Sequence, residues 1–598
     1  MHACIHTAAA NGIHMKQIRN TMPSNVHWRI HFLAFCVFGS ACVILVRMYS
    51  LQVTASQKYD DIALNQHLLS EEISPDRGEI FLKDSANPYP LAVNRQLALA
   101  YISPKEIQEG DKVVSELSRI LQVDQQFIKD KLARTTSAFE IVKRKLSDEE
   151  VLQVKNLHAK GVYLVPETYR YYPGGELASQ VVGFMGFDKD KVVGRYGMEA
   201  YFEEELRGSS GSVVQEKDAG GRWIPIADRS ITPAENGDSF VLTMSREVQY
   251  EVEKRLKDAV EEFHADSGTV VVMQPQTGRI VSMASYPQFN PNEYSKVEDI
   301  QLFMNPAVSE PYEAGSVIKA ITEAIGIEDG KISPDTTYVD TGTITEGGYT
   351  IHNSEEKVYG LQTMTQALEE SINTGMIYIE RLVGNKKFAD YFKRFGFGEK
   401  TGIELPAELG GNLRNLQDMK NNVQFYTASF GQGVTVTPLQ LVSAYSVLAN
   451  GGRLMKPQIV EKIIHSDGSE EEVAPQEVRR VVSESTAKQM GTMLRNVVVN
   501  GHGKKADVPG YLVGGKTGTA QIAKTDGRGY EEGKNIGSFV GYAPINDPKF
   551  VIAVKIVNPK GVQWAESSAA PTFQKVMKFL LEYEKIQPTE TVQTKPLN

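Results

Sequence analysis

A long apolar run near the N-terminus is the feature that most limits what this chain can fold into. Residues 30–46 have the sequence IHFLAFCVFGSACVILV, and apolar residues continue to Leu51. A helix of this length can cross a bilayer. A cleaved signal peptide and a buried core helix are the alternatives, but the run is longer than a usual signal core and no small-residue cleavage site follows closely. We therefore predict a transmembrane anchor over residues 30–51.

The charges on either side of the apolar run indicate its direction. Lys16, Arg19 and Arg29 precede it without any acidic residue, whereas acidic residues follow soon after it, beginning with Asp60. Basic flanking segments stay in the cytoplasm. We therefore expect residues 1–29 to form a cytoplasmic segment and everything after the anchor to lie outside the membrane.

Composition argues against several classes of function. The chain has 598 residues, of which 41% are hydrophobic and 23% charged, so it can bury more than one core. Its formal net charge of −10 provides no basic field for nucleic acid, and we expect no nucleic-acid partner. The cysteines are Cys4, Cys36 and Cys42, which leaves the rest of the chain without a disulfide or a thiolate metal site. We expect neither a metal nor a cofactor.

Two globular parts are expected after the anchor, because no repeat of 20–50 residues is present. The first spans residues 52–235 and ends in glycine- and proline-containing stretches at 208–211 and 232–237. The second spans residues 236–585. The tail at 586–598 contains two prolines and is expected to be disordered.

The second part combines helical and strand patterns. A helix over 248–263 leads into two β-rich runs, 268–274 and 279–285, and a last helix is expected over 570–583. Further helices are expected near 317–326, 362–371, 374–382, 437–449 and 485–499, and further strands at 511–517, 538–543 and 550–557. Helices flanking a sheet that is built from both ends of the domain predict an α+β architecture.

A serine and a lysine three residues apart mark the start of one predicted helix. In the segment YEAGSVIK, Ser316 and Lys319 share one helical face. An alcohol is a poor nucleophile, and a neighbouring amine whose pKa is lowered by burial can accept its proton. The pattern S-x-x-K arises by chance about twice in a chain of this length. A second copy, from Ser485 to Lys488, matches ordinary helix capping after Ser483.

Two further motifs follow in the same domain. Ser371-Ile-Asn373 lies between two predicted helices and offers a hydroxyl that can relay a proton and an amide that can orient a carbonyl. Lys516-Thr-Gly-Thr519 lies on a predicted strand and offers a cation and two hydroxyls to a carboxylate. Each motif is weak evidence alone. Ser and Asn are common in any loop between helices, and a surface β-turn explains the Lys516-Thr-Gly-Thr519 sequence equally well.

The last motif overlaps a phosphate-loop pattern. Residues 510–517, GYLVGGKT, fit G-x-x-x-x-G-K-[ST]. Such a loop needs a buried strand before it and a helix that starts at the Lys-Thr pair. The preceding KKADVP and the following GTAQIAK predict neither, and ATP is scarce outside the cytoplasm. We therefore disfavour nucleotide binding.

The order S-x-x-K, S-x-N, K-T-G resembles that of the penicillin-binding and active-site-serine β-lactamase superfamily. Similarity to class B, monofunctional penicillin-binding proteins covers nearly the whole chain after residue 30. RGEI at 77–80, RYYP at 170–173 and GME at 197–199 look like the motifs of the pedestal domain, and FGQG at 430–433 and FVGYAP at 539–544 are family-like. The resemblance implies a transmembrane helix, a pedestal (dimerisation-like) domain at 52–235, and a transpeptidase domain at 236–585 with an antiparallel sheet flanked by helices.

The same resemblance implies roles for the motif residues. Ser316 would be the acylated nucleophile, Lys319 its general base, Ser371 a proton relay and Asn373 a holder of the substrate peptide. The substrate carboxylate would be held by Lys516, Thr517, Gly518 and Thr519, with the backbone N–H groups of Ser316 and Thr519 as the oxyanion hole. Lys319 is expected to be neutral, and Lys516 charged.

The implied reaction is D,D-transpeptidation of D-alanyl-D-alanine stem peptides of peptidoglycan, with β-lactams as inhibitors that stall at the acyl-enzyme. Implied partners are the membrane, a polytopic glycan polymerase and other division proteins, and the implied location is the bacterial cytoplasmic membrane with the catalytic domain outside. Departures from the family pattern, which put inhibitor affinity in doubt, occur at Ala314, Val317, Ile318, Ile372 and His502. Residues 504–510 favour the division branch. An elongation-type enzyme, a β-lactam sensor and a β-lactamase are the alternatives.

Overall fold

The computed structural model describes residues 24–54, 68–84, 87–189, 191–216, 229–524 and 529–588. The described chain divides into two compact units, one from Met1–Ile73 with Ser210–Pro233 and one from Ser74–Ser209 with Ala234–Asn598. Most of the predicted cytoplasmic segment and most of the predicted tail lie outside the described residues. The predicted boundary at residue 235 stays a prediction.

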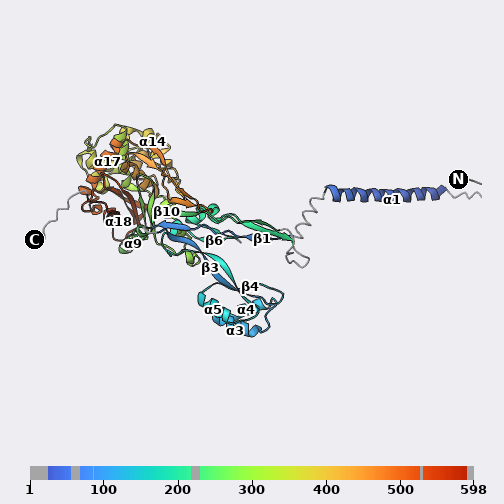
Figure 1. Cartoon of the computed structure of the whole chain (residues 1–598). Helices are drawn as coiled ribbons and strands as arrows, with labels where there is room; N and C mark the ends of the chain where they lie inside the picture. The colour runs from blue at the N-terminus through green and yellow to red at the C-terminus, as the bar shows by residue number, and fades with distance from the viewer. Residues whose placement is uncertain are drawn as a thin grey trace, which may run out of the picture. The chain divides into compact units, whose positions relative to one another are not determined.

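The first unit contains the predicted anchor. Helix α1 (Ser24–Tyr49) continues into a π-helical turn, η1 (Ser50–Thr54), and the stretch Trp28–Thr54 is long and apolar enough to cross a membrane (Figure 1). Its large apolar side chains are exposed, which is typical of a helix that lipid surrounds. Among the described residues, the prediction of a single N-terminal apolar helix is therefore confirmed. A three-stranded antiparallel sheet completes this unit, in the order β1 (Leu68–Ile73), β8 (Gly211–Glu216), β9 (Arg229–Thr232).

The second unit begins with a mixed sheet that joins distant parts of the sequence. Strand β10 runs parallel to β2 and antiparallel to β18, so the sheet contains strands from before and after residue 235. Its order is β19-β18-β10-β2-β3-β4, with β5 also paired to β3. The strands are β2 (Ile80–Lys83), β3 (Tyr89–Ile102), β4 (Glu140–Leu146), β5 (Val162–Tyr171), β10 (Ser239–Ser245), β18 (Val460–Ile464) and β19 (Glu470–Glu472).

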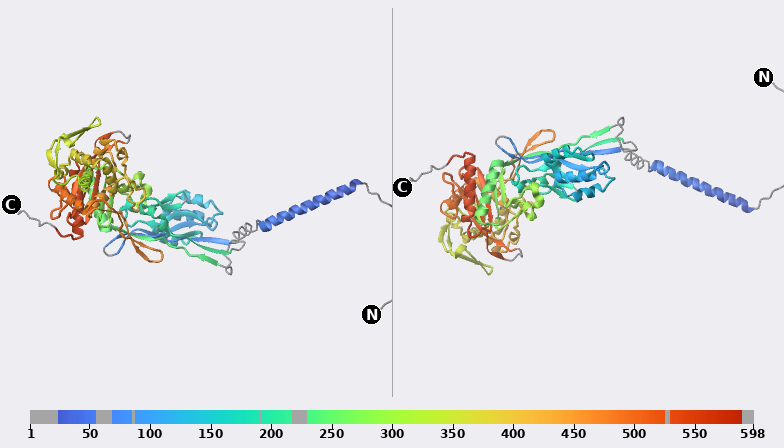
Figure 2. Two further views of the ribbon diagram at one scale, coloured as in Figure 1. Left: turned by 90° about the horizontal axis from the view of Figure 1, so that it is seen from above. Right: turned by 90° about the horizontal axis from the view of Figure 1, so that it is seen from below.

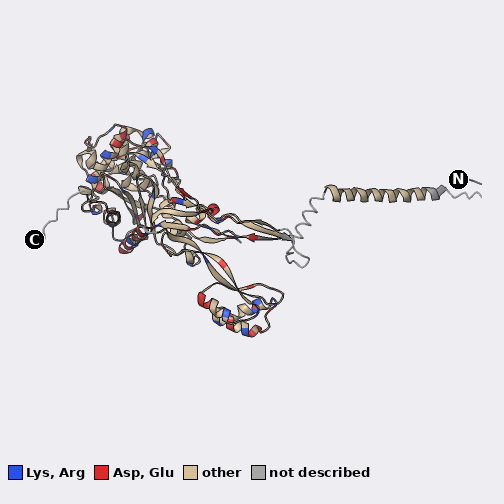
Figure 3. Ribbon diagram, in the orientation of Figure 1, with Lys and Arg blue, Asp and Glu red and all other residues tan. Residues whose placement is uncertain are grey.

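Three helices form a small separate core with β3, β4 and β5. They are α3 (Gly110–Leu121), α4 (Gln125–Leu132) and α5 (Asp148–Asn156). Helix α3 is amphipathic, and its buried residues Val114, Leu117 and Leu121 follow the helical period. Acidic and basic residues are interspersed along these helices (Figure 3).

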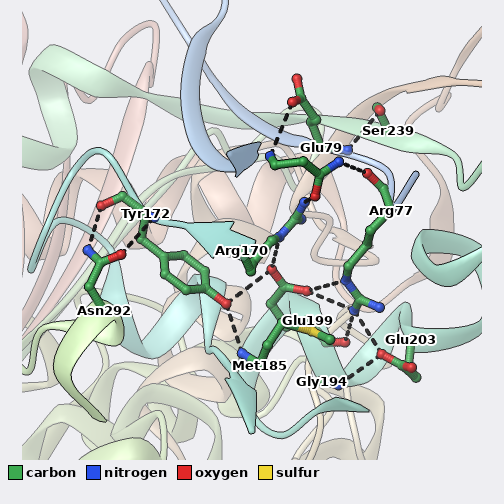
Figure 4. A network of polar contacts seen from close by, with 11 residues as sticks. Arg77, Glu79, Arg170, Tyr172, Met185, Gly194, Glu199, Glu203, Ser239 and Asn292 are labelled. Atoms are coloured by element: carbon green, nitrogen blue, oxygen red, sulfur yellow. Dashed lines mark hydrogen bonds and ion pairs between the residues drawn. The ribbon is translucent and has the colours of Figure 1, made fainter. Parts of the chain in front are cut away.

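A buried ion network ties together the three segments that resemble pedestal motifs (Figure 4). Glu199, on the short helix α7 (Gly197–Tyr201), is fully buried and accepts hydrogen bonds from Arg170 Nε at 2.7 Å and Arg77 Nε at 2.8 Å. Burial alone would raise the pKa of Glu199, but the two guanidinium groups hold it below its usual value. Tyr172 extends the network, since its backbone N–H and C=O bond to the side chain of Asn292.

A five-stranded antiparallel sheet forms the centre of the second unit. Its order is β12 (Ile280–Tyr286), β11 (Ser267–Met273), β23 (Phe550–Val557), β22 (Tyr530–Ala543), β21 (Gly514–Ala523). Side chains alternate between its faces. On β11, Val270 and Val272 pack with α9 (Arg246–Glu262) and α18 (Ala569–Tyr583), whereas Val271 and Met273 join the cluster that contains α16 (Pro438–Ala449). Figure 2 shows α18 in red beside α9 in green.

Helices therefore cover both faces of this sheet, and the predicted α+β class is confirmed. The helices that carry or support the motifs are α11 (Lys319–Glu328), α12 (Met364–Glu369), α13 (Asn373–Val383), α14 (Asn385–Arg394), α15 (Asn422–Ser429) and α17 (Glu484–Val499). Shorter helices are α6 (Ser179–Val182), α8 (Glu203–Arg207) and α10 (Pro306–Ser309). Two-stranded sheets pair β6 (Met185–Asp188) with β7 (Lys191–Gly194), β13 (Thr337–Asp340) with β16 (Gly360–Thr363), β14 (Thr343–Glu346) with β15 (Tyr349–His352), and β17 (Arg453–Met455) with β20 (Glu477–Arg480).

One predicted strand is displaced. We expected a strand over residues 511–517, but β21 begins at Gly514 and continues to Ala523. Tyr511 and Val513 instead form local turn bonds, in which Tyr511 N–H donates to Val508 O and Val513 N–H donates to Tyr511 O. Pairing with β22 keeps the glycine- and threonine-rich residues after 514 extended, although their local pattern is weak.

Candidate active site

Ser316 lies in η4 (Gly315–Ile318), a 3-10 helix of one turn, and Lys319 is the first residue of α11. Gly315 has φ of +58°, in the left-handed region, and its N–H donates to Gly431 O at 3.1 Å. Ser316 is half-buried, whereas Lys319 is only 1% exposed. The turn thus presents the hydroxyl at the surface and keeps the amine one helical turn further on and away from water.

The S-x-N motif lies against this amine. Ser371 connects α12 to α13 with φ of +57°, an uncommon conformation for a residue other than glycine. Lys319 Nζ lies within hydrogen-bond distance of three oxygens: the backbone oxygen of Ser371, Ser371 Oγ at 3.2 Å, and Asn373 Oδ1 at 2.7 Å. Strained backbone of this kind occurs where the surrounding structure fixes a functional group. Here it directs both oxygens of Ser371 toward one lysine.

The K-T-G motif lies on the edge strand β21, on the other side of Ser371. Lys516 is fully buried, and its Nζ donates to Ser371 Oγ at 3.1 Å and to Thr517 O at 3.2 Å. The Ser371 hydroxyl therefore lies between two amines. Gly518 permits this packing, because a Cβ at that position would lie 2.5 Å from Ala314 O, next to the serine turn.

Burial sets the charge of both lysines. Loss of hydration, followed by repulsion from Lys516, places the pKa of Lys319 well below its usual value. Burial also lowers the pKa of Lys516 to about 7, against a smaller opposing effect of Glu566. The expectation of a neutral Lys319 agrees with this direction. The expectation of a charged Lys516 stays a prediction; burial opposes the charged form, and a bound anion would favour it.

A cleft of about 620 Å³ opens over these groups. Ser316, Lys319, Ser371, Asn373, Thr517 and Thr519 all line it, while Lys516 donates to the lining residue Ser371 and Gly518 lies between the lining residues Thr517 and Thr519. One wall comes from residues 350–359, and further lining residues are His502, Trp564 and Glu566. Of these, the sequence singled out His502 alone, as a departure from the family pattern; Trp564 and Glu566 carry no local sequence signal, and only the tertiary fold brings them to the motifs.

The two competing motifs behave as ordinary structure. Ser485 and Lys488 are exposed on α17, and Ser483 caps this helix by accepting a hydrogen bond from Thr486 N–H at 3.1 Å. Lys516 lies within an antiparallel strand instead of at the start of a helix, so the phosphate-loop interpretation is wrong. Within the described ranges, no group of three or more His, Cys, Asp or Glu side chains could hold a metal ion.

A hydroxyl before a helix, a buried amine of lowered pKa one turn later, and a second buried amine on an adjoining edge strand define an active-site-serine acyl transferase. Two family models match the chain: the penicillin-binding protein transpeptidase domain over residues 268–578 and the penicillin-binding protein dimerisation domain over residues 72–242. The chain belongs to the penicillin-binding protein transpeptidase family, in the class B arrangement.

Known proteins agree with this assignment over most of their length. Stage V sporulation protein D of Bacillus subtilis is 34% identical, covering 94% of this chain and 87% of that protein. The probable peptidoglycan D,D-transpeptidase PenA of Neisseria meningitidis is 28% identical, covering 96% of both. The crystal structure of penicillin binding protein 3 from Mycobacterium tuberculosis with aztreonam is 27% identical, covers 87% of this chain and 99% of that one, and has a TM-score of 0.67.

Proposed function

We propose that this chain is a serine D,D-transpeptidase that cross-links peptidoglycan stem peptides through an acyl-enzyme on Ser316. One observation carries the proposal: the buried, low-pKa amine of Lys319 lies one helical turn after Ser316 and contacts both Ser371 and Asn373. PenA, a relative over nearly its whole length, is named as a probable peptidoglycan D,D-transpeptidase.

The first half-reaction acylates the serine. Neutral Lys319 accepts the proton of Ser316 while Oγ attacks the carbonyl carbon between the last two D-alanines. The carbonyl electrons move to oxygen, where the backbone N–H groups of Ser316 and Thr519 would stabilise the charge. The C–N bond then breaks, and the proton on Lys319 passes by way of the Ser371 hydroxyl to the departing amine of D-alanine.

The second half-reaction transfers the acyl group. An amine of a neighbouring strand attacks the ester carbonyl, the bond to Ser316 Oγ breaks, and the amine's proton returns through Lys319 to the serine. Asn373 would orient the substrate peptide, because its amide lies between Lys319 and His352 O. A β-lactam stops at the first stage because its leaving group stays attached.

The second lysine is suited to a carboxylate. Lys516, Thr517, Gly518 and Thr519 would hold the terminal carboxylate of the stem peptide, which is also present in β-lactams. A bound carboxylate favours the charged amine, so binding would raise the pKa of Lys516 and oppose the effect of burial.

The setting that we propose is septal wall synthesis at the bacterial cytoplasmic membrane, with the N-terminus in the cytoplasm and residues after α1 outside. A polytopic glycan polymerase and other division proteins would be its partners. An algal relative from Mesostigma viride, named as an FtsI homolog, is 26% identical over 94% of this chain. Because another relative is named for sporulation, a role in sporulation is the second candidate.

The proposal is tested with the purified full chain and a penicillin. Mass spectrometry should find a long-lived adduct on Ser316, absent in Ser316→Ala and unchanged in Ser485→Ala. Rapid turnover of the penicillin would indicate a β-lactamase instead. In the native cell, Ser316→Ala should fail to support septation, and a defect confined to sporulation would select the second candidate.

A further inference from the structure

A buried carboxylate lies close to the motif residues without belonging to any motif. Asp340, at the end of β13, is 2% exposed. Its Oδ1 accepts from Thr374 Oγ1 at 2.5 Å and Gly342 N–H at 3.0 Å, its Oδ2 accepts from Tyr359 N–H at 2.7 Å, and Asn353 Nδ2 lies 3.0 Å from both oxygens. These hydrogen bonds hold the pKa of Asp340 below its usual value although burial opposes this.

The donors to Asp340 lie at the two ends of the chain segment that forms one wall of the cleft. The chain leaves Asp340, forms the hairpin β14–β15 and the turn η5 (Ser354–Glu356), and returns at Tyr359. Residues 350–355, 357 and 359 of this excursion line the cleft. Asn353 ties the two ends of its own turn, because its amide also donates to Lys357 O at 3.1 Å. The position of the wall therefore depends on Asp340 and Asn353.

The same groups also reach the S-x-N motif. Thr374 N–H donates to Asn353 Oδ1 at 3.1 Å, while the Thr374 hydroxyl donates to Asp340. One residue earlier on each segment, Asn373 Nδ2 donates to His352 O at 2.9 Å. Two parallel tethers thus join residues 352–353 to residues 373–374. The remaining polar atom of the Asn373 amide, Oδ1, accepts from Lys319.

We propose that Asp340, Asn353 and Thr374 form a network that positions the acyl-transfer site. The hydrogen bonds of this network fix the amide of Asn373 and the cleft wall relative to Lys319. The inference rests on the proposed function. Thr374 is 3% exposed and Asn353 4% exposed, so the tether between these two residues is shielded from competing water, whereas the tether between Asn373 and His352 is exposed. Displacing a reacting or orienting group by about 1 Å can cost a hundredfold in rate.

The test measures acylation of the full chain in detergent by a fluorescent penicillin. Burst amplitude gives the fraction of folded sites, and the first-order constant at saturating penicillin gives the rate at each folded site. Thr374→Val removes the hydroxyl at constant shape and should leave the amplitude full while lowering the rate constant about tenfold to a hundredfold. Thr374→Ser restores the donor and should return the constant to within about threefold of wild type.

A buried threonine elsewhere provides the control. Thr572 is 1% exposed, and its hydroxyl donates to Ser568 O at 2.9 Å within α18, so Thr572→Val loses a comparable bond without touching the network. Its rate constant should equal that of wild type.

Three results would overturn the inference: a wild-type rate constant in Thr374→Val with only reduced amplitude, an equal loss in Thr572→Val, or no recovery in Thr374→Ser. Asp340→Asn should show a larger loss of rate than Thr374→Val. If the Asp340→Asn variant does not fold, the threonine variants alone test the inference. A wild-type chain that forms no adduct would instead count against the proposed function.

Discussion

Replacing Lys516 with glutamine should move the acidic limb of the acylation pH profile to higher pH. The limb reports loss of the proton from Lys319, whose pKa is lowered first by burial and then by the charge on Lys516. The protonated form of Lys516 opposes a proton on Lys319. Glutamine removes that repulsion, so the pKa of Lys319 rises and a more alkaline solution is needed to generate the base.

The size of the shift follows from the geometry around Ser371. The two amines lie 3.2 and 3.1 Å from the same Oγ, so they are within about 6 Å of each other. At an effective dielectric constant of about 20, two unit charges at this distance repel by about 3 kcal/mol. This energy corresponds to about two pH units. Because both groups are buried, added salt should change the shift little.

The assay is the acylation rate constant of the full chain with a penicillin, measured across pH at constant ionic strength. Absolute rates should fall in Lys516→Gln, since a carboxylate contact is lost, but the midpoint of the limb is independent of amplitude. Lys516→Arg keeps the charge, and its midpoint should stay near that of wild type. A midpoint that does not move in Lys516→Gln, or that moves equally in both variants, would refute the electrostatic explanation.

Three further predictions concern other parts of the structure. Lys319→Arg, which cannot deprotonate, should lower the acylation rate about a hundredfold or more, and a near-wild-type rate with an unchanged pH profile would remove Lys319 from the mechanism. Gly518→Ala would place a Cβ 2.5 Å from Ala314 O and should lower the same rate about tenfold with little loss of thermal stability, whereas an unchanged rate would show that β21 can move away freely. Glu199→Gln leaves two buried arginines without a full counter-charge and should lower the free energy of unfolding by about 3–5 kcal/mol, measured by denaturant titration. Because the folded pKa of Glu199 is below its unfolded value, its contribution should be present at neutral pH and be lost as pH falls through the folded pKa; a loss under about 1 kcal/mol, as for an exposed ion pair, would contradict this.

The motif order selected the candidate catalytic residues from sequence, because each motif combines a local pattern with a chemical role, and the structure brings these candidates together around one cleft. Ser316 with Lys319, and Ser371 with Asn373, lie at the helix starts and connections where they were expected. The bounds of β21 were predicted wrongly, because long-range pairing with β22, more than local propensity, keeps residues 514–523 extended.

Other functional features leave no local trace in the sequence. Asp340 and Asn353 are thirteen positions apart, and the pairing of β14 with β15 between them makes them neighbours. The lowered pKa of Lys516 has a similar origin, because the sequence shows a lysine but does not show that it is completely buried.

The place of β21 in its sheet has a consequence for how varied a substrate can be. Because β21 is the last strand in the order, one of its edges has no neighbour within that five-stranded sheet. An extended peptide can join such an edge as an added strand, with hydrogen bonds between the two main chains. These bonds do not depend on side-chain identity, and successive side chains point to opposite sides. A site of this kind would bind a peptide mainly through its main-chain hydrogen bonds. It would contact only every second side chain, so the remaining side chains could vary.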